Sequence, residues 1–307
     1  MRDIKKITGT PKSQPKRIRF ATVGIFKDKY SVQTLCEYLG VSRQGYYKWV
    51  GNGEPIHVKY NPILAYLVKE IFNRRRKGYR YVAMQLKRKF GVIISPKTAY
   101  RYMRILGLKS AVRKRHHAKA YYSETRAQTR IVSPNVLNRD FTAEHPLEKL
   151  VTDVSYIYHK NGKLYLSVIK DLYDNSIISY KISVVNDNDL VFKTVEAAGR
   201  RRHNAKTILH SDQGSQYTHP DYLAKLAKYH FIPSNSRKGN CLDNACCENF
   251  FGHLKAECLY LEKPKSAKRL VSQVRKYIDF YNRDRPQEKL KGMTPFEYRK
   301  ACLQLLH

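Results

Sequence analysis

From residue 147 onward the chain changes to strand-like periodicity, and this change constrains its fold more than any other feature. Three runs rich in β-branched and aromatic residues, LVTDVSYIYH, KLYLSVIKDLY and SIISYKISVV, are separated by the turn sequences NGK and DN. This pattern predicts an antiparallel meander of three strands. Helices over residues 189–202 and 221–229 then alternate with strand-like runs in KTILHS and FIPSNS. We therefore expect an α/β domain with a mixed five-stranded sheet and flanking helices.

Three acidic residues stand out in this part of the chain. Asp153 lies inside the first apolar run, Asp212 follows the run TILHS, and Glu248 lies on a helix predicted further on. A carboxylate inside so apolar a run needs a partner, and a metal ion is a suitable one. Mg²⁺ binds a few carboxylates and keeps positions for water and phosphate, and two such ions about 4 Å apart stabilise both oxygens of a phosphoryl displacement. The three carboxylates therefore predict a site for two-metal phosphoryl transfer.

Two assignments stay open on the residues alone. Asp171 is the alternative to Asp153, because it also closes an apolar strand. His210 and Gln216 lie close to Asp212 in the sequence, and each either positions water or phosphate or makes hydrogen bonds within the core.

The helix predicted around Glu248 also carries a basic residue. One face of it, at α-helical spacing, consists of Asn244, Glu248, Phe251, Gly252 and Lys255. We expect Lys255 to point the same way as Glu248 and to touch a nucleic-acid phosphate that enters the site. A polar loop before the helix offers two further expected DNA contacts, Arg237 and Lys238.

The net charge of +34 is unevenly distributed along the 307 residues. Residues 1–135 carry 31 Lys and Arg against 6 Asp and Glu, whereas residues 136–307 carry 28 against 19. The basic half is therefore expected to form the main nucleic-acid surface, with a general basic protein such as a ribosomal protein as the alternative.

Helix-forming patterns fill this basic half. Ser31 and Ser42 are positioned to cap two short helices on either side of Gly40, which predicts a helix-turn-helix. The second of these helices would offer DNA the side chains of Arg43, Gln44, Tyr46, Tyr47 and Lys48. The alternative is an ordinary helical hairpin in which the aromatic residues are core. Further helices follow from Asn61 to Gly107, and their basic residues expected to bind phosphates are Arg74, Arg75, Arg76, Lys77 and Arg80.

Four strings in order resemble the transposases of insertion sequence family three: TDVSY, HSDQGSQY, SRKGNCLDNACCENFFGHLK and YIDFYNRDRPQEKLKGMTPFEY. That family has an Asp-Asp-Glu triad on a ribonuclease H-like core, with thirty-five residues between the last two acids. Its triad falls on Asp153, Asp212 and Glu248, and its basic residue one heptad later on Lys255. The TDVSY context favours Asp153 over Asp171 as the first acid. The resemblance implies Mg²⁺, with Mn²⁺ as a substitute, and cleavage and joining of the element's ends through a circular intermediate. Integration into target DNA by a homo-oligomeric synaptic complex would follow.

The expected organisation is a basic tail (1–30), a helical helix-turn-helix region (31–108), a basic linker (109–146), the ribonuclease H-like core (147–262) and a C-terminal helical extension (263–307). Partners are expected to be double-stranded DNA, both terminal inverted repeats and target, and the product of an upstream reading frame. Neither a membrane span nor a signal sequence is visible, so we expect a cytoplasmic, nucleoid-associated bacterial protein. The alternatives are an integrase or nuclease with the same core and a DNA-binding protein that has lost catalysis.

Overall fold

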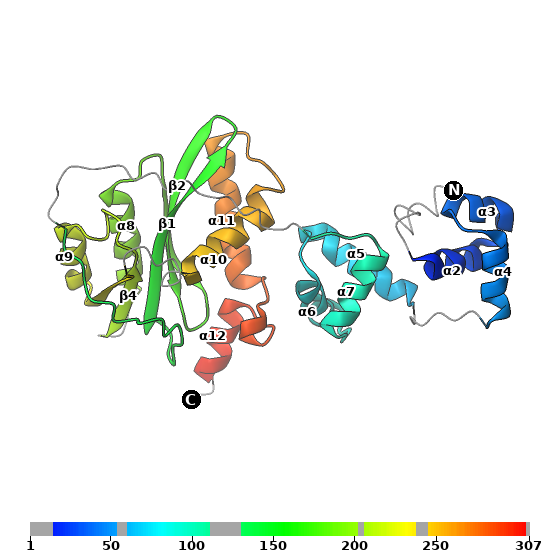
Figure 1. Cartoon of the computed structure of the whole chain (residues 1–307). Coiled ribbons are helices and arrows are strands. Elements are labelled where there is room, and N and C mark those ends of the chain that lie inside the picture. Colours follow the sequence, from blue (N-terminus) through cyan, green and yellow to red (C-terminus); the bar gives the residue numbers. More distant parts are fainter. Residues whose placement is uncertain (1–14, 54–59, 111–129, 202–205, 238–244, 305–307) are drawn as a thin grey trace. The chain divides into compact units, whose positions relative to one another are not determined.

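The computed structural model describes residues 15–53, 60–110, 130–201, 206–237 and 245–304. The chain divides into two compact units, Met1–Ala111 and Val112–His307. Figure 1 shows the elements of each unit.

The first three helices of the N-terminal unit form a small cluster around one core. They are α2 (Lys16–Phe26), α3 (Val32–Leu39) and α4 (Arg43–Gly51). As expected, Ser31 caps α3, Gly40 ends it in the left-handed conformation (φ 61°), and Ser42 caps α4. The expected tail over residues 1–30 is wrong for α2, because Val23 of this helix is fully buried against α3 and α4.

A second set of helices in this unit has a core of its own. It consists of α5 (Pro62–Arg75), α6 (Tyr79–Phe90) and α7 (Pro96–Ile105). Asn61 caps α5 and Ser95 caps α7: each side chain accepts a hydrogen bond from the helix backbone, and a proline follows each. Apolar residues of all three helices pack together, with Val68, Val82 and Leu86 fully buried.

The C-terminal unit contains the expected mixed sheet of five strands. These are β1 (Lys149–His159), β2 (Gly162–Asp171), β3 (Ile177–Ser183), β4 (Thr207–Ser211) and β5 (Phe231–Asn235). Their order is β3-β2-β1-β4-β5. Strands β1 to β3 form the predicted antiparallel meander, while β4 pairs parallel with both β1 and β5. The predicted α/β architecture is confirmed.

Helices cover both faces of this sheet (Figure 1). On one side, α8 (Asn188–Gly199) and α9 (Pro220–Lys228) share a core with Leu150 of β1. On the other, α10 (Ala245–Leu254), the π-helix η3 (Lys255–Leu259) and α11 (Ala267–Arg283) pack over Val151. Successive residues of a strand point to opposite faces, so Asp153 lies on the α10 side of the sheet.

Segments outside the predicted core boundaries pack onto the same sheet. Leu137, in the expected linker, is 2% exposed, and its backbone N–H donates to Ser234 of β5. The described residues 130–146 therefore belong to the C-terminal unit. At the other end, η4 (Glu288–Leu290) leads to α12 (Pro295–Gln304), whose Arg299 forms ion pairs with Asp171 and Asp174. The C-terminal extension thus packs on the core.

Candidate active site

Asp153 and Asp212 lie on neighbouring strands because of the register between β1 and β4. The parallel pairing aligns Val151 with His210. Continuing that register by two residues brings Asp153 opposite Asp212, which follows the last residue of β4. The parallel strand β4 thus ends beside the middle of the long strand β1, and the two carboxylates meet there.

Backbone and side-chain hydrogen bonds fix the turn that holds Asp212. Its Oδ1 accepts a 2.9 Å hydrogen bond from the Gly214 N–H, and its carbonyl accepts one of 3.0 Å from Asn235. The Asn235 amide also donates to Ser211 and accepts from the Ser133 backbone. A side chain at Gly214 would start 3.0 Å from Asp212 Oδ1, so glycine there leaves the carboxylate room.

Glu248 comes from the first turn of α10, a helix that packs against β1. Its side chain is exposed, unlike the two aspartates. The carboxylates nevertheless interact electrostatically. Burial, and after it the negative charges of Asp212 and Glu248, raise the pKa of Asp153 to about 8, against the lowering effects of the Val154 N–H and Lys255. Burial also raises the pKa of Asp212. The negative charges of Asp212 and Glu248 therefore both act on the Asp153 carboxylate.

Lys255 lies at the same site, although the predicted helix face is wrong in detail. The helix changes from α to π geometry at Lys255, so the α-helical spacing does not extend to the lysine. Phe251 and Gly252, one turn after Glu248 in α10, are buried. The Lys255 ammonium donates a 2.8 Å hydrogen bond to Ser155 and lies 5.2 Å from the Tyr156 ring centroid. Asn244, expected on the same face, lies outside the described residues.

Asp171 has a different environment, which distinguishes it from Asp153. It is fully buried and accepts hydrogen bonds from the backbone N–H groups of Leu147 and Tyr173. Its third partner is the guanidinium of Arg299, 2.6 Å away, which also pairs with the buried Asp174. Burial and the neighbouring Asp174 raise the pKa of Asp171 to about 7. Its oxygens are thus committed to contacts that join β2, the turn after it and α12.

Two buried residues near the triad were not assigned a role from the sequence. The Tyr217 side chain is 2% exposed, and the charges of Asp153 and Asp212 help to raise the pKa of its phenol, after burial itself. Lys170 of β2 is 4% exposed, and its ammonium donates to the backbone carbonyl of Cys246 at 3.1 Å. A lysine inside the apolar run LSVIKD was the available signal, because lysine is almost never buried without a reason.

The two open residues near Asp212 have core or loop contacts. His210 is fully buried and shares a 2.9 Å hydrogen bond with Ser234. Gln216 donates to the Asn186 carbonyl at 3.4 Å. His210 therefore has the core role that was one of its two predicted readings.

The structure separates the expected DNA-binding residues of the N-terminal unit into exposed and buried groups. On α4, the exposed side chains are Arg43, Gln44, Tyr47 and Lys48, whereas Tyr46 belongs to the core. Around the end of α5, Arg74, Arg76 and Arg80 are exposed and Arg75 is half-buried. Lys77 is 6% exposed and lies over the Tyr81 ring, so its expected phosphate contact is wrong. Arg237 is exposed, and Lys238 lies outside the described residues.

Whether a divalent metal ion could bind here depends on the positions and charges of the three carboxylates. Among the described residues, no three His, Cys, Asp or Glu side chains lie close enough to hold one ion together. Two ions, each between a pair of carboxylates, need no such group of three. Burial, and after it the charges of Asp212 and Glu248, raise the pKa of Asp153, and a bound cation would offset both effects. All three ligands would be oxygens, which Mg²⁺ prefers. The residues present fit the ion.

Comparison with known proteins covers both units. Residues 143–241 and 248–303 match families described as Integrase core domain, and residues 60–116 match the HTH-like domain. The last match falls on α5 to α7 and not on α3 and α4, where the sequence analysis placed the helix-turn-helix. The chain is 42% identical over 235 residues, 76% of its length and 81% of the relative's, to the putative transposase InsK for insertion sequence element IS150 of Escherichia coli K12.

Further relatives agree with this match. The transposase InsF for insertion sequence IS3A of Escherichia coli K12 is 31% identical over 90% of this chain and 96% of its own length. Among solved structures, the HTLV-2 integrase catalytic core domain in complex with magnesium is 16% identical and covers 51% of this chain and 98% of its own, with a TM-score of 0.41.

An integrase-type core preceded by a helix-turn-helix-like domain defines a transposase. The chain belongs to the transposases of insertion sequence family three. In the part of the chain that the structure describes, none of the helices is long and apolar enough to cross a membrane.

Proposed function

We propose that this chain cleaves the ends of its insertion sequence and joins them to target DNA, with Asp153, Asp212 and Glu248 as its catalytic, metal-binding carboxylates. The observation that carries the proposal is the parallel register of β1 and β4, which brings Asp153 beside Asp212. In agreement with it, burial and the charges of the other two acids raise the pKa of Asp153. Such mutual repulsion costs free energy in the folded protein, and it becomes useful when the acids share cations. When bound, a pair of Mg²⁺ ions would activate the attacking oxygen and stabilise the leaving oxygen of the phosphodiester.

The chain's own residues supply position and charge. The charges of Asp212 and Glu248 both act on Asp153, so Asp153 is the carboxylate that would hold both cations. Asp212 is held rigidly by Gly214 and Asn235. Lys255, beside Ser155, is placed to hold a phosphate of the DNA strand. Since the cores of β1 and β4 are buried, these groups keep their positions while the DNA is exchanged.

Double-stranded DNA, at the terminal repeats and at the target, is the proposed partner, and a homo-oligomer the proposed active form. The exposed basic residues of α4 and of the segment after α5 support a DNA-binding role for the N-terminal unit. The product of an upstream reading frame is a further proposed partner. The proposed location of the protein is the bacterial nucleoid.

The test is strand cleavage by the purified full chain with Mg²⁺ on duplexes that carry the ends flanking its gene. Asp153→Asn, Asp212→Asn and Glu248→Gln should each abolish cleavage and leave DNA binding within about twofold, because the amides keep the shape but lose the charge. Asp221→Asn, an exposed acid at the start of α9, is the matched control and should cleave normally. An active Asp153→Asn protein would overturn the assignment. Cleavage of any duplex, without preference for the ends, would indicate a nuclease instead.

A further inference from the structure

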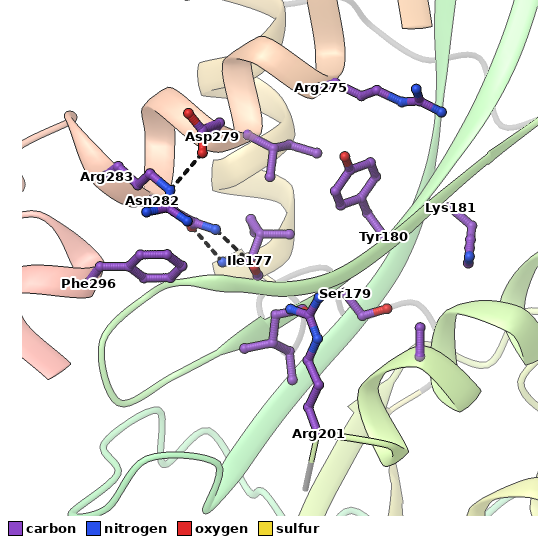
Figure 2. Close-up of a pocket in the computed structure, with 13 residues that line it drawn as sticks. Ile177, Ser179, Tyr180, Lys181, Arg201, Arg275, Asp279, Asn282, Arg283 and Phe296 are labelled. Carbon is purple, nitrogen blue, oxygen red and sulfur yellow. Dashed lines mark hydrogen bonds and ion pairs between the residues drawn. The ribbon is translucent and has the colours of Figure 1, made fainter. Parts of the chain in front are cut away.

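A second basic site lies at the edge of the sheet, away from the triad. It is a groove of about 310 Å³ between β3, the end of α8 and α11. Strand β3 is the edge of the sheet, two strands away from β1. Four cationic side chains line the groove against a single carboxylate, Asp279. The cations are Lys181, Arg201, Arg275 and Arg283. Figure 2 shows them around Tyr180 and the edge of β3.

The charges of the groove are only partly neutralised. Asp279 is paired with Arg283 one helical turn later, at 2.8 Å. Arg201 uses one of its N–H groups on the Ile178 carbonyl, at 3.0 Å, and its other donors are left for a ligand. Lys181 and Arg275 form no ion pair with any residue that the structure describes. The groove therefore keeps a net positive charge of three, with two cations available on opposite walls.

The edge strand itself is closed to a partner strand at this end. The Asn282 side chain accepts a 2.9 Å hydrogen bond from the Ile177 N–H and donates one of 2.9 Å to its carbonyl (Figure 2). Arg201 occupies the next carbonyl, that of Ile178. A peptide adding to β3 would find these backbone groups taken. The chemistry that remains on offer is that of exposed ammonium and guanidinium groups, which suits phosphate oxygens.

We propose that the β3–α11 groove binds the phosphodiester backbone of a DNA duplex outside the scissile position. The cations stand on a strand, on a helix and after another helix, so they can follow an extended polyanion across the edge of the sheet. Phe296, 38% exposed, lies beneath the Arg283 guanidinium at 5.1 Å and gives this rim an apolar floor for a sugar. Phosphate contacts carry no sequence information, so the groove holds any duplex equally. The inference rests on the DNA-processing function proposed above.

The test is the salt dependence of DNA binding by the full chain. Lys181→Gln/Arg275→Gln removes two phosphate contacts, so the slope of log K against log salt should fall by about 2, for an unrelated duplex as for the element's end. The matched control is Lys268→Gln/Lys276→Gln, which removes two exposed charges of α11 that do not line the groove. Its slope should change by less than about half a unit. An equal change of the salt slope in both variants, or an unchanged slope in the groove variant, would overturn the proposal.

A crosslink gives a second, direct readout. Benzoylphenylalanine in place of Phe296 should crosslink to duplex DNA, and the yield should fall at least about fivefold when Lys181 and Arg275 are also replaced. If the groove variant instead changes the sedimentation of the free protein while its salt slope stays unchanged, the surface binds protein and the proposal is wrong. Cleavage of the element's ends by the unsubstituted chain is measured alongside, because it tests the proposed function independently of the groove.

Discussion

The Lys255 ammonium donates a 2.8 Å hydrogen bond to the hydroxyl of Ser155, and Ser155 follows Asp153 by two residues on the same face of β1. The helix that carries Glu248 is thus tied to the strand that carries Asp153 by a basic side chain. The turn at Lys255 is a π-helix, a geometry found mostly at functional sites because it shifts the side chains that follow. The lysine is held in place before DNA arrives.

Replacing Lys255 should affect cleavage far more than binding. One phosphate contact changes the salt slope by only about one unit, whereas a small displacement of the reacting phosphate costs about 100-fold in rate. We expect Lys255→Ala to cleave about 100-fold more slowly in single-turnover assays at saturating protein, and Lys255→Arg to recover part of the rate. The cleavage rate of Ser155→Ala should lie between those of Lys255→Ala and Lys255→Arg, because this substitution removes the hydrogen bond to Lys255 but keeps the charge of the lysine. Parental cleavage by Lys255→Ala would show that the lysine has no part in the reaction.

Arg299 should contribute strongly to the stability of the catalytic unit. Its guanidinium pairs with two fully buried carboxylates, and removing one partner of a buried pair costs about 3–5 kcal/mol. Arg299→Met should therefore destabilise the unit by roughly 3 kcal/mol. Arg200→Met is the control, because it breaks only an exposed pair with Glu196 and should cost under about 0.5 kcal/mol.

The measurement must report on the correct unit. The single tryptophan, Trp49, lies in the N-terminal unit, so its fluorescence does not follow the sheet. Hydrogen exchange of the β1 and β2 amides does, and their protection should fall in Arg299→Met and stay unchanged in Arg200→Met. Equal protection in both proteins would mean that the ion pairs of Arg299 add nothing to stability.

The sequence predicted most of the fold because its signals were local. Ser31, Ser42 and Asn61 cap helices through hydrogen bonds to residues three positions on, and strand alternation placed Asp153 on its side of β1. The convergence of the triad came from the family's motifs and not from physical reasoning on the chain, since no periodicity reveals which strands become neighbours.

The errors concern contacts between residues far apart in the sequence. Asp171 and Asp153 look alike as acids in apolar strands; the TDVSY context favoured Asp153, but the ion pair of Asp171 with Arg299, 128 residues later, could not be predicted. The helix α2 was missed because its basic composition resembles a tail, while its burial depends on α3 and α4. The π turn at Lys255 was invisible because α-helical spacing was assumed throughout.

Metal binding should depend on pH through Asp153. Its pKa, raised to about 8 by burial and by the neighbouring acids, means that the metal-free protein carries a proton there at neutral pH. A cation needs the carboxylate, so binding must displace that proton. We expect Mn²⁺ or Mg²⁺ affinity to rise with pH, by up to about tenfold per unit, and to level off above about 8.

Calorimetry in buffers of different ionisation enthalpy measures the displaced protons directly. Close to one proton should be released at pH 7, and most of this release should vanish in Asp153→Asn. The raised pKa of Asp153 makes metal affinity increase with pH, but it makes the stability of the metal-free protein decrease with pH. Since the folded pKa lies above the unfolded value, the contribution of Asp153 to stability falls as pH rises from about 4 to about 8. Metal binding without proton release at pH 7 would contradict this account.

Lys170 should position Glu248 and add little to stability. Its buried ammonium donates to the carbonyl of Cys246, two residues before Glu248 in the first turn of α10. Burying a charge with so few partners is costly, and an apolar replacement of similar size is often neutral or stabilising. Lys170→Met should therefore unfold no more readily than the parent protein.

The same substitution releases the start of α10, so Glu248 should lose its fixed position over Asp153. We expect single-turnover cleavage by Lys170→Met to fall about 10- to 100-fold with unchanged DNA binding, and hydrogen exchange at residues 247–250 to increase. Lys170→Arg keeps a donor and should retain more activity. The control is Lys193→Met, which removes an exposed lysine paired with Asp189 on α8 and should change neither readout. A Lys170→Met protein that loses stability in proportion to its activity would show that the lysine supports the fold and does not position the glutamate.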